Sequence, residues 1–296
     1  MEMKLRDWIN PNNLNWNYLS ANPNAISLLK KNFDKINWHY LSTNTNPNAI
    51  EILENNPDKI NWALLSKNPS AISLLENNFN KICWYYLSQN PSAIHLISQN
   101  LNKICWYNLV RNPNAISILQ NNQDKIDWNI LSGNPNAISL LQNNQDKINW
   151  NYLGFNPNAI ELLKNNLHNI DWSFYLNLNP NSIELLLSNN HLISWSPLST
   201  NPNAISLLEN NPHKINWETL SQNPNAIHLL ENNQNKINWS NLSTNPSIFI
   251  YDYETIKLKN KELNQEIIEK ALHPQRMLRL MNEYDEDYIY YCFFDE

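Results

Sequence analysis

The chain has 296 residues, a net charge of −6 at neutral pH, 12 tryptophans and two glycines, Gly133 and Gly154. The acidic balance argues against a general binder of polyanions. Two isolated glycines exclude a phosphate-binding loop, a dinucleotide fingerprint and a nucleophile elbow, because all three need clustered glycine. No stretch approaches the ~18 apolar residues of a membrane helix, and residues 1–10 lack the apolar core of a signal peptide. We therefore expect a cytoplasmic protein that is neither secreted nor bound to a membrane.

A single short repeat fills most of the chain. Eleven tryptophans from Trp16 to Trp239 follow one another at steps of 22 residues, except for one step of 24 and one of 23. An Asn-Pro pair follows each tryptophan, and each repeat proline that precedes a tryptophan lies 15 residues before it. Both length changes therefore fall between tryptophan and proline. A fixed period of this kind predicts a solenoid in which each unit packs only on its neighbours.

The chain begins with a partial repeat. Residues 1–21 contain Trp8 and Leu14 in repeat-like positions, and we expect them to form an N-terminal cap. The helical repeat array then covers residues 22–246.

The first element of each repeat is predicted to be a helix of about nine residues that starts at the proline. Asparagine before the proline is a favoured N-cap, and proline suits the first helical position. In one unit, Ala137, Ile138, Leu140 and Leu141 then share one helix face. Asparagine returns nine residues after the proline, where we expect it to close the helix in the left-handed conformation.

The second element is predicted to be a shorter helix that starts at the tryptophan. The preceding residue is Asn, Asp or Ser in most units, which again indicates an N-cap. Isoleucine two residues before tryptophan and leucine three residues after it place the tryptophan ring in the core. A strand at K-I-N-W would instead give an α/β horseshoe, but the signature of leucine-rich repeats is absent. The two cap sets favour helices, and stacking at ~8–10 Å per layer predicts a rod or superhelix on the order of 100 Å long.

Beyond Pro246 the motif breaks, and residues 247–296 are predicted to form a C-terminal helical cap. Glu254 to Leu272 is charged and amphipathic, and a second helical run follows His273-Pro274. The segment 285–296 is an acidic, aromatic tail. The fold class is therefore all-α: an α-solenoid of about ten to eleven two-helix repeats with a cap at each end.

The repeat unit N-P-N-A-I-x-L-L-x-N-N-x-D-K-I-N-W-x-x-L-S resembles a short helical repeat of uncharacterised proteins from giant DNA viruses of amoebae. The stretch E-x-x-I-E-K-A-L-H-P-Q-R-M-L-R-L, residues 266–280, is similar to the C-terminal segment of such proteins. The resemblance implies a viral source and the solenoid architecture. It implies a location in the host cytoplasm or the virion, and no activity or cofactor.

Several side chains with chemical potential repeat along the array. His168, His191 and His213 occupy one position of successive units, and we interpret them as turn residues because a full repeat separates them. Lysines recur from Lys35 to Lys236; they could meet phosphates, but an edge of the fold that complements helix C-termini is favoured. Arg276 and Arg279 share one helix face and could bind an acidic partner or the chain's own Asp285-Glu286-Asp287. Cys83 and Cys105 are expected to be reduced, because stacking holds them beyond disulfide reach.

Solenoids bind partners through variable residues on a constant frame, and the variable positions here are the first, second and fifth residues after tryptophan. They are rich in tyrosine over the first half of the chain, and tyrosine and arginine are enriched at interface hot spots. The candidate partner-binding residues are Tyr18, His39, Tyr40, Lys67, Tyr85, Tyr86, Gln89, Tyr107, Arg111, Tyr152 and Phe155. The first and fifth positions are expected to be exposed, whereas the second could equally pack between repeats.

The sequence thus predicts a non-enzymatic scaffold that binds a protein partner, of host or virus, through its short helices. No residue is assigned a catalytic, metal-binding or cofactor-binding role. A nucleic-acid reader that stacks one base per repeat is the alternative, and the negative charge weighs against it. A structural component of a viral particle is compatible with the same surface.

Replacing Tyr85, Tyr107 and Arg111 together by alanine should abolish capture of the partner while circular dichroism shows unchanged helicity, because these side chains are predicted to be exposed. Retained capture would move the site away from the short helices.

Overall fold

The structure is a computed structural model that describes residues 2–172 and 174–283. Two compact units divide the chain, one of Leu5–Ile250 and one of Met1–Lys4 with Tyr251–Glu296. The predicted all-α repeat solenoid is confirmed, since helices recur with the 22-residue period throughout Leu5–Ile250. The strand alternative at K-I-N-W is wrong: in the described part of the chain, strand structure is limited to β1 (Met3–Leu5) and β2 (Phe249–Tyr251), which form one small sheet. The tail 285–296, with Cys292, lies outside the described residues.

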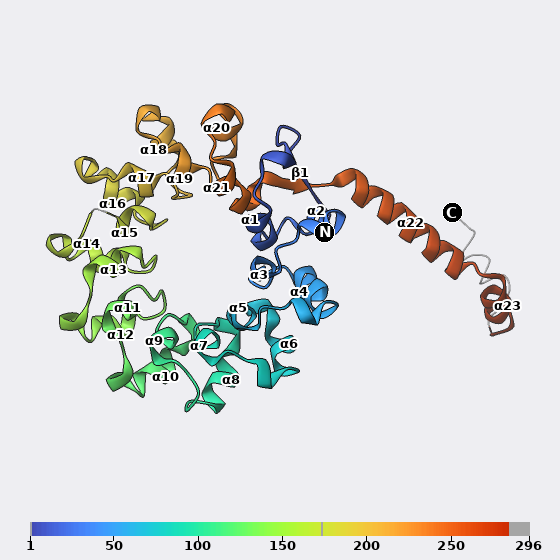
Figure 1. Cartoon of the computed structure of the whole chain (residues 1–296), viewed down its shortest axis with the longest axis horizontal. Coiled ribbons are helices and arrows are strands. Elements are labelled where there is room, and N and C mark those ends of the chain that lie inside the picture. Colours follow the sequence, from blue (N-terminus) through green and yellow to red (C-terminus); the bar gives the residue numbers. More distant parts are fainter. Residues whose placement is uncertain (1, 173, 284–296) are drawn as a thin grey trace. The chain divides into compact units, whose positions relative to one another are not determined.

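The repeats alternate between two sets of helices, which Figure 1 shows on the inner and outer sides of the array. The inner helices are α1 (Trp16–Ala21), α3 (Trp38–Leu41), α5 (Trp62–Lys67), α7 (Trp84–Leu87), α9 (Trp106–Leu109), α11 (Trp128–Ser132), α13 (Trp150–Phe155), α15 (Tyr175–Leu178), α17 (Trp195–Leu198), α19 (Trp217–Leu220) and α21 (Trp239–Thr244). The outer helices are α2 (Ile26–Lys31), α4 (Pro47–Glu54), α6 (Ile72–Glu76), α8 (Ile94–Gln99), α10 (Ile116–Gln120), α12 (Ile138–Gln142), α14 (Ile160–Lys164), α16 (Ile183–Leu187), α18 (Ile205–Glu209) and α20 (Ile227–Glu231).

Short 3-10 turns connect these helices. Turns before outer helices or at the ends of the array are η1 (Pro11–Asn13), η4 (Pro69–Ala71), η6 (Pro91–Ala93), η7 (Pro113–Ala115) and η14 (Pro246–Ile248). Turns from an outer to an inner helix are η2 (Phe33–Lys35), η3 (Pro57–Lys59), η5 (Phe79–Lys81), η8 (Gln123–Lys125), η9 (Gln145–Lys147), η10 (Leu167–Asn169), η11 (Asn190–Leu192), η12 (Pro212–Lys214) and η13 (Gln234–Lys236). The step that starts at the repeat proline before an outer helix is a 3-10 turn in η4, η6 and η7, belongs to the helix in α4, and is a plain turn in the other repeats, so every outer helix is shorter than the nine residues expected.

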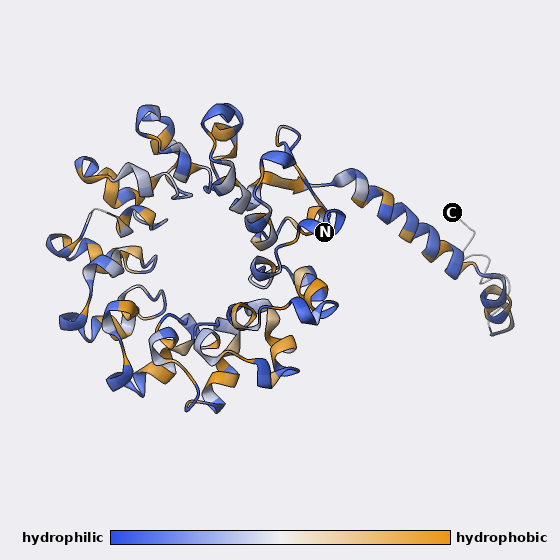
Figure 2. Ribbon diagram, in the orientation of Figure 1, coloured by the Kyte–Doolittle hydropathy of each residue, from blue (hydrophilic) through white to orange (hydrophobic). Residues whose placement is uncertain are grey.

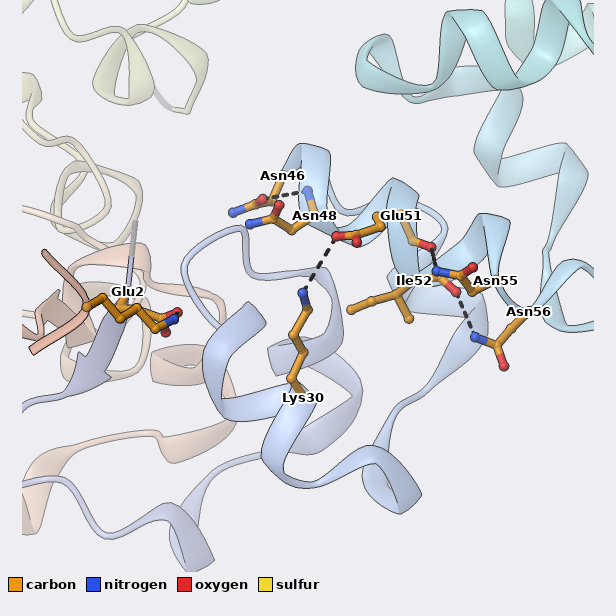
Figure 3. A network of polar contacts seen from close by, with 9 residues as sticks. Glu2, Lys30, Asn46, Asn48, Glu51, Ile52, Asn55 and Asn56 are labelled. Atoms are coloured by element: carbon orange, nitrogen blue, oxygen red, sulfur yellow. Dashed lines mark hydrogen bonds and ion pairs between the residues drawn. The ribbon is translucent and has the colours of Figure 1, made fainter. Parts of the chain in front are cut away.

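The predicted caps are present, although the outer helices end differently from the expectation. In Figure 3, Asn46 accepts a hydrogen bond from the N–H of Asn48 at the start of α4, and Asn56 closes the same helix by donating its amide to the carbonyl of Ile52 at 2.8 Å. The left-handed cap is wrong, because no non-glycine residue in the described ranges has a positive φ. Asn56 instead has φ −137°, a conformation in which the side chain itself reaches the carbonyl four residues back.

The core consists of columns of aliphatic side chains that run from repeat to repeat. Leucine three residues after tryptophan is fully buried in ten of the eleven repeats, as Leu131 and Leu153 illustrate, and Leu176 takes its place in the repeat of Trp172. Alanine after the Asn-Pro pair and the second leucine of the outer helix, such as Ala137 and Leu141, are also fully buried. Figure 2 shows the corresponding hydrophobic residues along the inner and outer helices of the array. Each buried Leu contributes ~1.5–3 kcal/mol relative to exposure, which offsets the weakness of such short helices in isolation.

The prediction that the tryptophan rings lie in the core is wrong. They are half-buried at all eleven positions. A lysine from the next repeat covers the ring in several units: the ammonium of Lys147 lies 4.4 Å from the ring centroid of Trp128, and that of Lys236 lies 4.4 Å from Trp217. A cation over an aromatic face is attracted by the ring quadrupole. The lysine row is therefore part of the packing between repeats.

A ladder of buried asparagines joins every repeat to the one before it. In each unit the carbonyl oxygen of the asparagine side chain caps its own chain, and the amide nitrogen donates to two backbone carbonyls of the preceding unit. Asn134 donates to the carbonyls of Val110 at 2.8 Å and Asn112 at 3.1 Å, and accepts from the N–H of Asn136. The ladder residues are Asn22, Asn44, Asn68, Asn90, Asn112, Asn134, Asn156, Asn179, Asn201, Asn223 and Asn245, and all are at most 2% exposed.

The same contacts close the array into a ring (Figure 1). The Asn22 amide donates to the carbonyls of Ser243 at 3.0 Å and Asn245 at 3.1 Å, so the last rung of the ladder meets the first. The N–H of Asn15 donates to the hydroxyl of Ser243 at 2.8 Å, as Asn37 does to Ser20 inside the array. The segment expected as an N-terminal cap thus packs on the last repeat, and the expected open rod is replaced by a closed ring.

The second unit contains two helices, α22 (Tyr253–Ala271) and α23 (Pro274–Glu283). Asp252 caps α22 by accepting from the N–H and the hydroxyl of Thr255. None of the residues of α22 is buried.

Replacing Asn134 by alanine should lower the free energy of unfolding by on the order of 3 kcal/mol, because two buried carbonyls and a capped N–H lose their partner. Asn136 is the matched control: its amide donates to the carbonyl of Pro113 at an exposed site, and its replacement by alanine should cost less than about 1 kcal/mol. Urea denaturation followed by tryptophan fluorescence measures both. Equal losses would show that the ladder is not the main link between repeats.

Closure is testable by cross-linking Asn17→Cys with Ser240→Cys, two exposed residues that directly follow Trp16 and Trp239. Because α1 and α21 are neighbours in the ring, a short bismaleimide should link the two thiols within one chain in high yield, as shown by mass spectrometry. Cys83→Asn, Cys105→Asn and Cys292→Ser provide the background. The pair Asn17→Cys with Asn129→Cys, on α1 and α11, should not react; an open array would leave both pairs unlinked.

Candidate functional site

The inner helices present a nearly continuous series of variable side chains along one side of the ring. The first residue after tryptophan is exposed at most positions, as in Tyr85 and Tyr107, whose exposed fractions are 52% and 50%. The second residue is half-buried or buried in most units, because it packs against the neighbouring inner helix; Tyr18, Tyr40 and Tyr86 are of this kind. The inner rim is this surface, formed by the variable residues that follow each repeat tryptophan.

Two small groups of candidate residues lie along the first part of the inner rim. Tyr18 and Tyr40 meet edge to face at 5.7 Å, and His39 packs on Tyr40 at 5.6 Å. Tyr85 and Tyr86 form a second edge-to-face pair at 5.2 Å. Lys67 is exposed at the end of α5, and Gln89 is half-buried two residues beyond the end of α7. The structure gathers these residues pairwise rather than into one site.

The remaining candidates converge around a single hollow. A pocket of about 480 Å³ is bounded on one side by Arg111 and on the other by Tyr152, Phe155 and Tyr175. The ring of Tyr175 stacks on Tyr152 at 5.3 Å and meets the edge of Phe155 at 6.4 Å. Stacked and edge-to-face aromatic pairs are favoured by about 0.5–1.5 kcal/mol beyond the area that they bury. The hollow thus has one wall of aromatic rings that pack on one another and one cationic wall.

Arg111 is itself held in place. Its guanidinium lies 5.3 Å from the ring centroid of Tyr107, and one of its nitrogens donates to the hydroxyl of that tyrosine at 3.3 Å. Arg111 is exposed, and no acidic residue lines the pocket. The guanidinium is therefore oriented and still has donors for an anionic group.

The hollow exists because of one glycine. Gly133 is the fifth residue after Trp128 and stands between Arg111 and Phe155, which hold the same position in the two flanking repeats. Its φ of −84° is open to any residue, and a β-carbon there would meet only the carbonyls of Ile130 and Tyr152 at 3.6 Å. The backbone therefore does not require glycine, and what glycine provides here is space.

Phe174 and Tyr175 were missed by sequence reasoning. Phe174 is the second residue after Trp172 and thus a variable position that was left out, whereas the extra residue between Trp172 and Pro180 places Tyr175 one position beyond it. The inner helix of this repeat accordingly starts at Tyr175 instead of the tryptophan. Phe174 is half-exposed and meets Tyr175 edge to face at 5.3 Å. The 23-residue step was the available signal.

The other residues singled out in the sequence do not form a site on the ring. His168, His191 and His213 lie exposed in separate 3-10 turns, as predicted. Within the described ranges no group of three or more His, Cys, Asp or Glu side chains could hold a metal ion. Lys125 forms a 2.9 Å ion pair with Asp124, and this hydrogen bond lowers the pKa of the Asp124 carboxyl. Cys83 and Cys105 are free, half-buried thiols.

Arg276 and Arg279 line a basic hollow of α23, and their proposed partner 285–287 lies outside the described residues. Over the described part of the chain, no helix combines the length and apolar character needed to cross a membrane. Comparison with protein-family models, with curated proteins and with solved structures finds no match to the chain.

Proposed function

We propose that this protein is a non-enzymatic ring scaffold that binds a protein partner through its inner rim. The observation that carries the proposal is the hollow between Arg111 and the aromatic wall of Tyr152, Phe155 and Tyr175. Exposed aromatic side chains that pack on one another beside an arginine have the composition of interface hot spots. The proposal gives no residue a catalytic role.

The chemistry of the hollow defines the kind of partner segment that fits it. The aromatic walls favour an apolar or aromatic side chain, and Arg111 favours a carboxylate next to it. We therefore expect a peptide segment in which an apolar side chain stands beside an acidic residue. The flanking tyrosines Tyr85 and Tyr107, exposed on α7 and α9, would extend the contact along the rim.

Binding to nucleic acid is less well supported by the same surface. The tyrosines could stack on bases, but affinity for nucleic acid depends on cations that neutralise phosphates. Five lysines beside the inner helices lie over tryptophan rings, as Lys103 does at 5.1 Å from Trp84. Lys67 and Arg111 remain as exposed cations on the inner helices or next to them. The chain as a whole carries a net charge of −6.

Filling the hollow should test the proposal without disturbing the ring. Gly133→Gln introduces glutamine, which two other repeats carry at the fifth position after tryptophan, as Gln89 and Gln222. The β-carbon of the new side chain has room. The change should reduce partner capture by at least ~10-fold. The partner would lose its apolar contact in the hollow and the pairing of its carboxylate with Arg111, and together these losses cost more than ~1.4 kcal/mol of binding free energy. Affinity purification from the native cell, with quantitative mass spectrometry and a nucleic-acid stain, is the measurement.

Thr200→Gln is the matched control, because Thr200 is the fifth residue after Trp195 and the change adds the same side chain there. The inner helix of that repeat, α17, carries Ser196 and Pro197 in place of aromatic residues. It should leave capture unchanged. Equal capture by both variants would reject the hollow as the binding site. Recovery of nucleic acid in place of a protein would reject the proposed class of partner.

A further inference from the structure

Helix α22 carries an apolar face that nothing covers within the described residues. It is 19 residues long and none of its side chains is buried. Leu263 and Ile267 are 54% and 55% exposed, and Tyr253 is 71% exposed. Figure 2 shows hydrophobic residues recurring along this otherwise hydrophilic helix. Soluble helices normally bury such a stripe against another element.

The spacing of these residues follows a coiled-coil seam. Tyr253, Asn260 and Ile267 are separated by seven residues each, and Ile256 and Leu263 follow the first two by three residues. These are the a and d positions of a heptad repeat. Tyr253, Ile256 and Asn260 also line one open hollow of about 580 Å³ along the helix. The seam ends at Lys270, which forms an ion pair with Glu266.

The residues at these positions favour one kind of partner. Ile267 at a with Leu263 at d favours two parallel strands, whereas Tyr253 at a and Ile256 at d do not add to this preference. A single asparagine at a, here Asn260, specifies register and oligomeric state, because the two asparagines of a parallel pair hydrogen-bond with each other. In an antiparallel pair Asn260 would face an apolar residue and lose that partner.

The flanking positions contain no like charges in the parallel arrangement. In a parallel dimer, each g residue faces the e residue five positions later in the second helix. Lys259 would face Asn264 of the second copy, and Glu266 would face Ala271. Asp252 precedes the helix and caps it through Thr255, so Lys257 of the second copy meets no like charge.

We propose that α22 pairs with α22 of a second copy of this chain in a parallel, two-stranded coiled coil through Tyr253, Ile256, Asn260, Leu263 and Ile267. The inference is independent of the function proposed for the inner rim. A dimer of this kind would contain two rings, one from each copy of the chain. A partner that needs both rings would then bind more tightly through avidity.

The mass of the full chain in solution tests the pairing. Sedimentation equilibrium over a concentration series should show reversible association from 34.8 kDa to twice that mass. Replacing Leu263 and Ile267 by lysine should weaken association by more than about 100-fold, because charged groups would be buried in the seam. Leu258→Lys is the matched control, since Leu258 is 62% exposed on the same helix but lies outside the seam. It should associate like the unaltered chain.

A monomer at all concentrations, or equal loss of association in both variants, would overturn the proposal. Circular dichroism and tryptophan fluorescence should be the same for all proteins, because none of the changes touches the ring. This comparison separates loss of pairing from loss of folding.

The orientation of the pair is tested by a disulfide. Asn260→Cys, in the background Cys83→Asn, Cys105→Asn and Cys292→Ser, should oxidise to a covalent dimer because identical a positions face each other only in a parallel pair. Leu258→Cys in the same background is the control and should stay monomeric under the same mild oxidation. Linking of both, or of neither, would exclude the parallel seam.

Discussion

The buried asparagine ladder is the interaction on which the rest of the ring depends. Each of its side chains uses one oxygen to cap its own chain and one nitrogen to hold two carbonyls of the preceding repeat. Each repeat therefore offers its neighbour the backbone carbonyl that receives the next asparagine. Because each ladder asparagine both donates to the preceding repeat and offers a carbonyl to the next one, the series can continue at its end. The amide of Asn22 accordingly donates to the carbonyl of Asn245.

The ladder also explains why the tight side of the ring is where the variable residues lie. The inner helices approach one another closely because small residues such as Ser20 and Ser132 stand between them, and these serines accept N–H groups of the next repeat. Most inner helices bury one large aliphatic side chain, whereas most outer helices bury two or three, as α12 does with Leu140 and Leu141. A difference in width between the two sides bends the stack. Side chains that point from the inner helices are thereby brought toward a common surface instead of being spread along a rod.

Much of the repeat could be read from the sequence because its causes are local. The N-caps, the buried leucine after tryptophan and the isoleucine before it depend on contacts within one unit or with the next. Closure could not be predicted, since it depends on a small rotation per repeat that accumulates over all units. The burial of tryptophan was overestimated because the covering group is a lysine, which a binary pattern treats as solvent-exposed. Arg111, Tyr152 and Phe155 could be recognised in the sequence as variable positions, but only the structure shows that Gly133 leaves a hollow among them.

The extra residues Thr45 and Asn46 show which changes in length the closed ring can accommodate. They enlarge one unit, yet the ladder passes through Asn44 and leaves Asn46 to cap α4. Insertions at this point are therefore absorbed outside the ladder. Gain or loss of a whole unit is different: an open solenoid only becomes longer or shorter, whereas a closed one must change the angle at every interface or break. During evolution this ring is expected to vary freely in the side chains of its rim and hardly at all in its number of repeats.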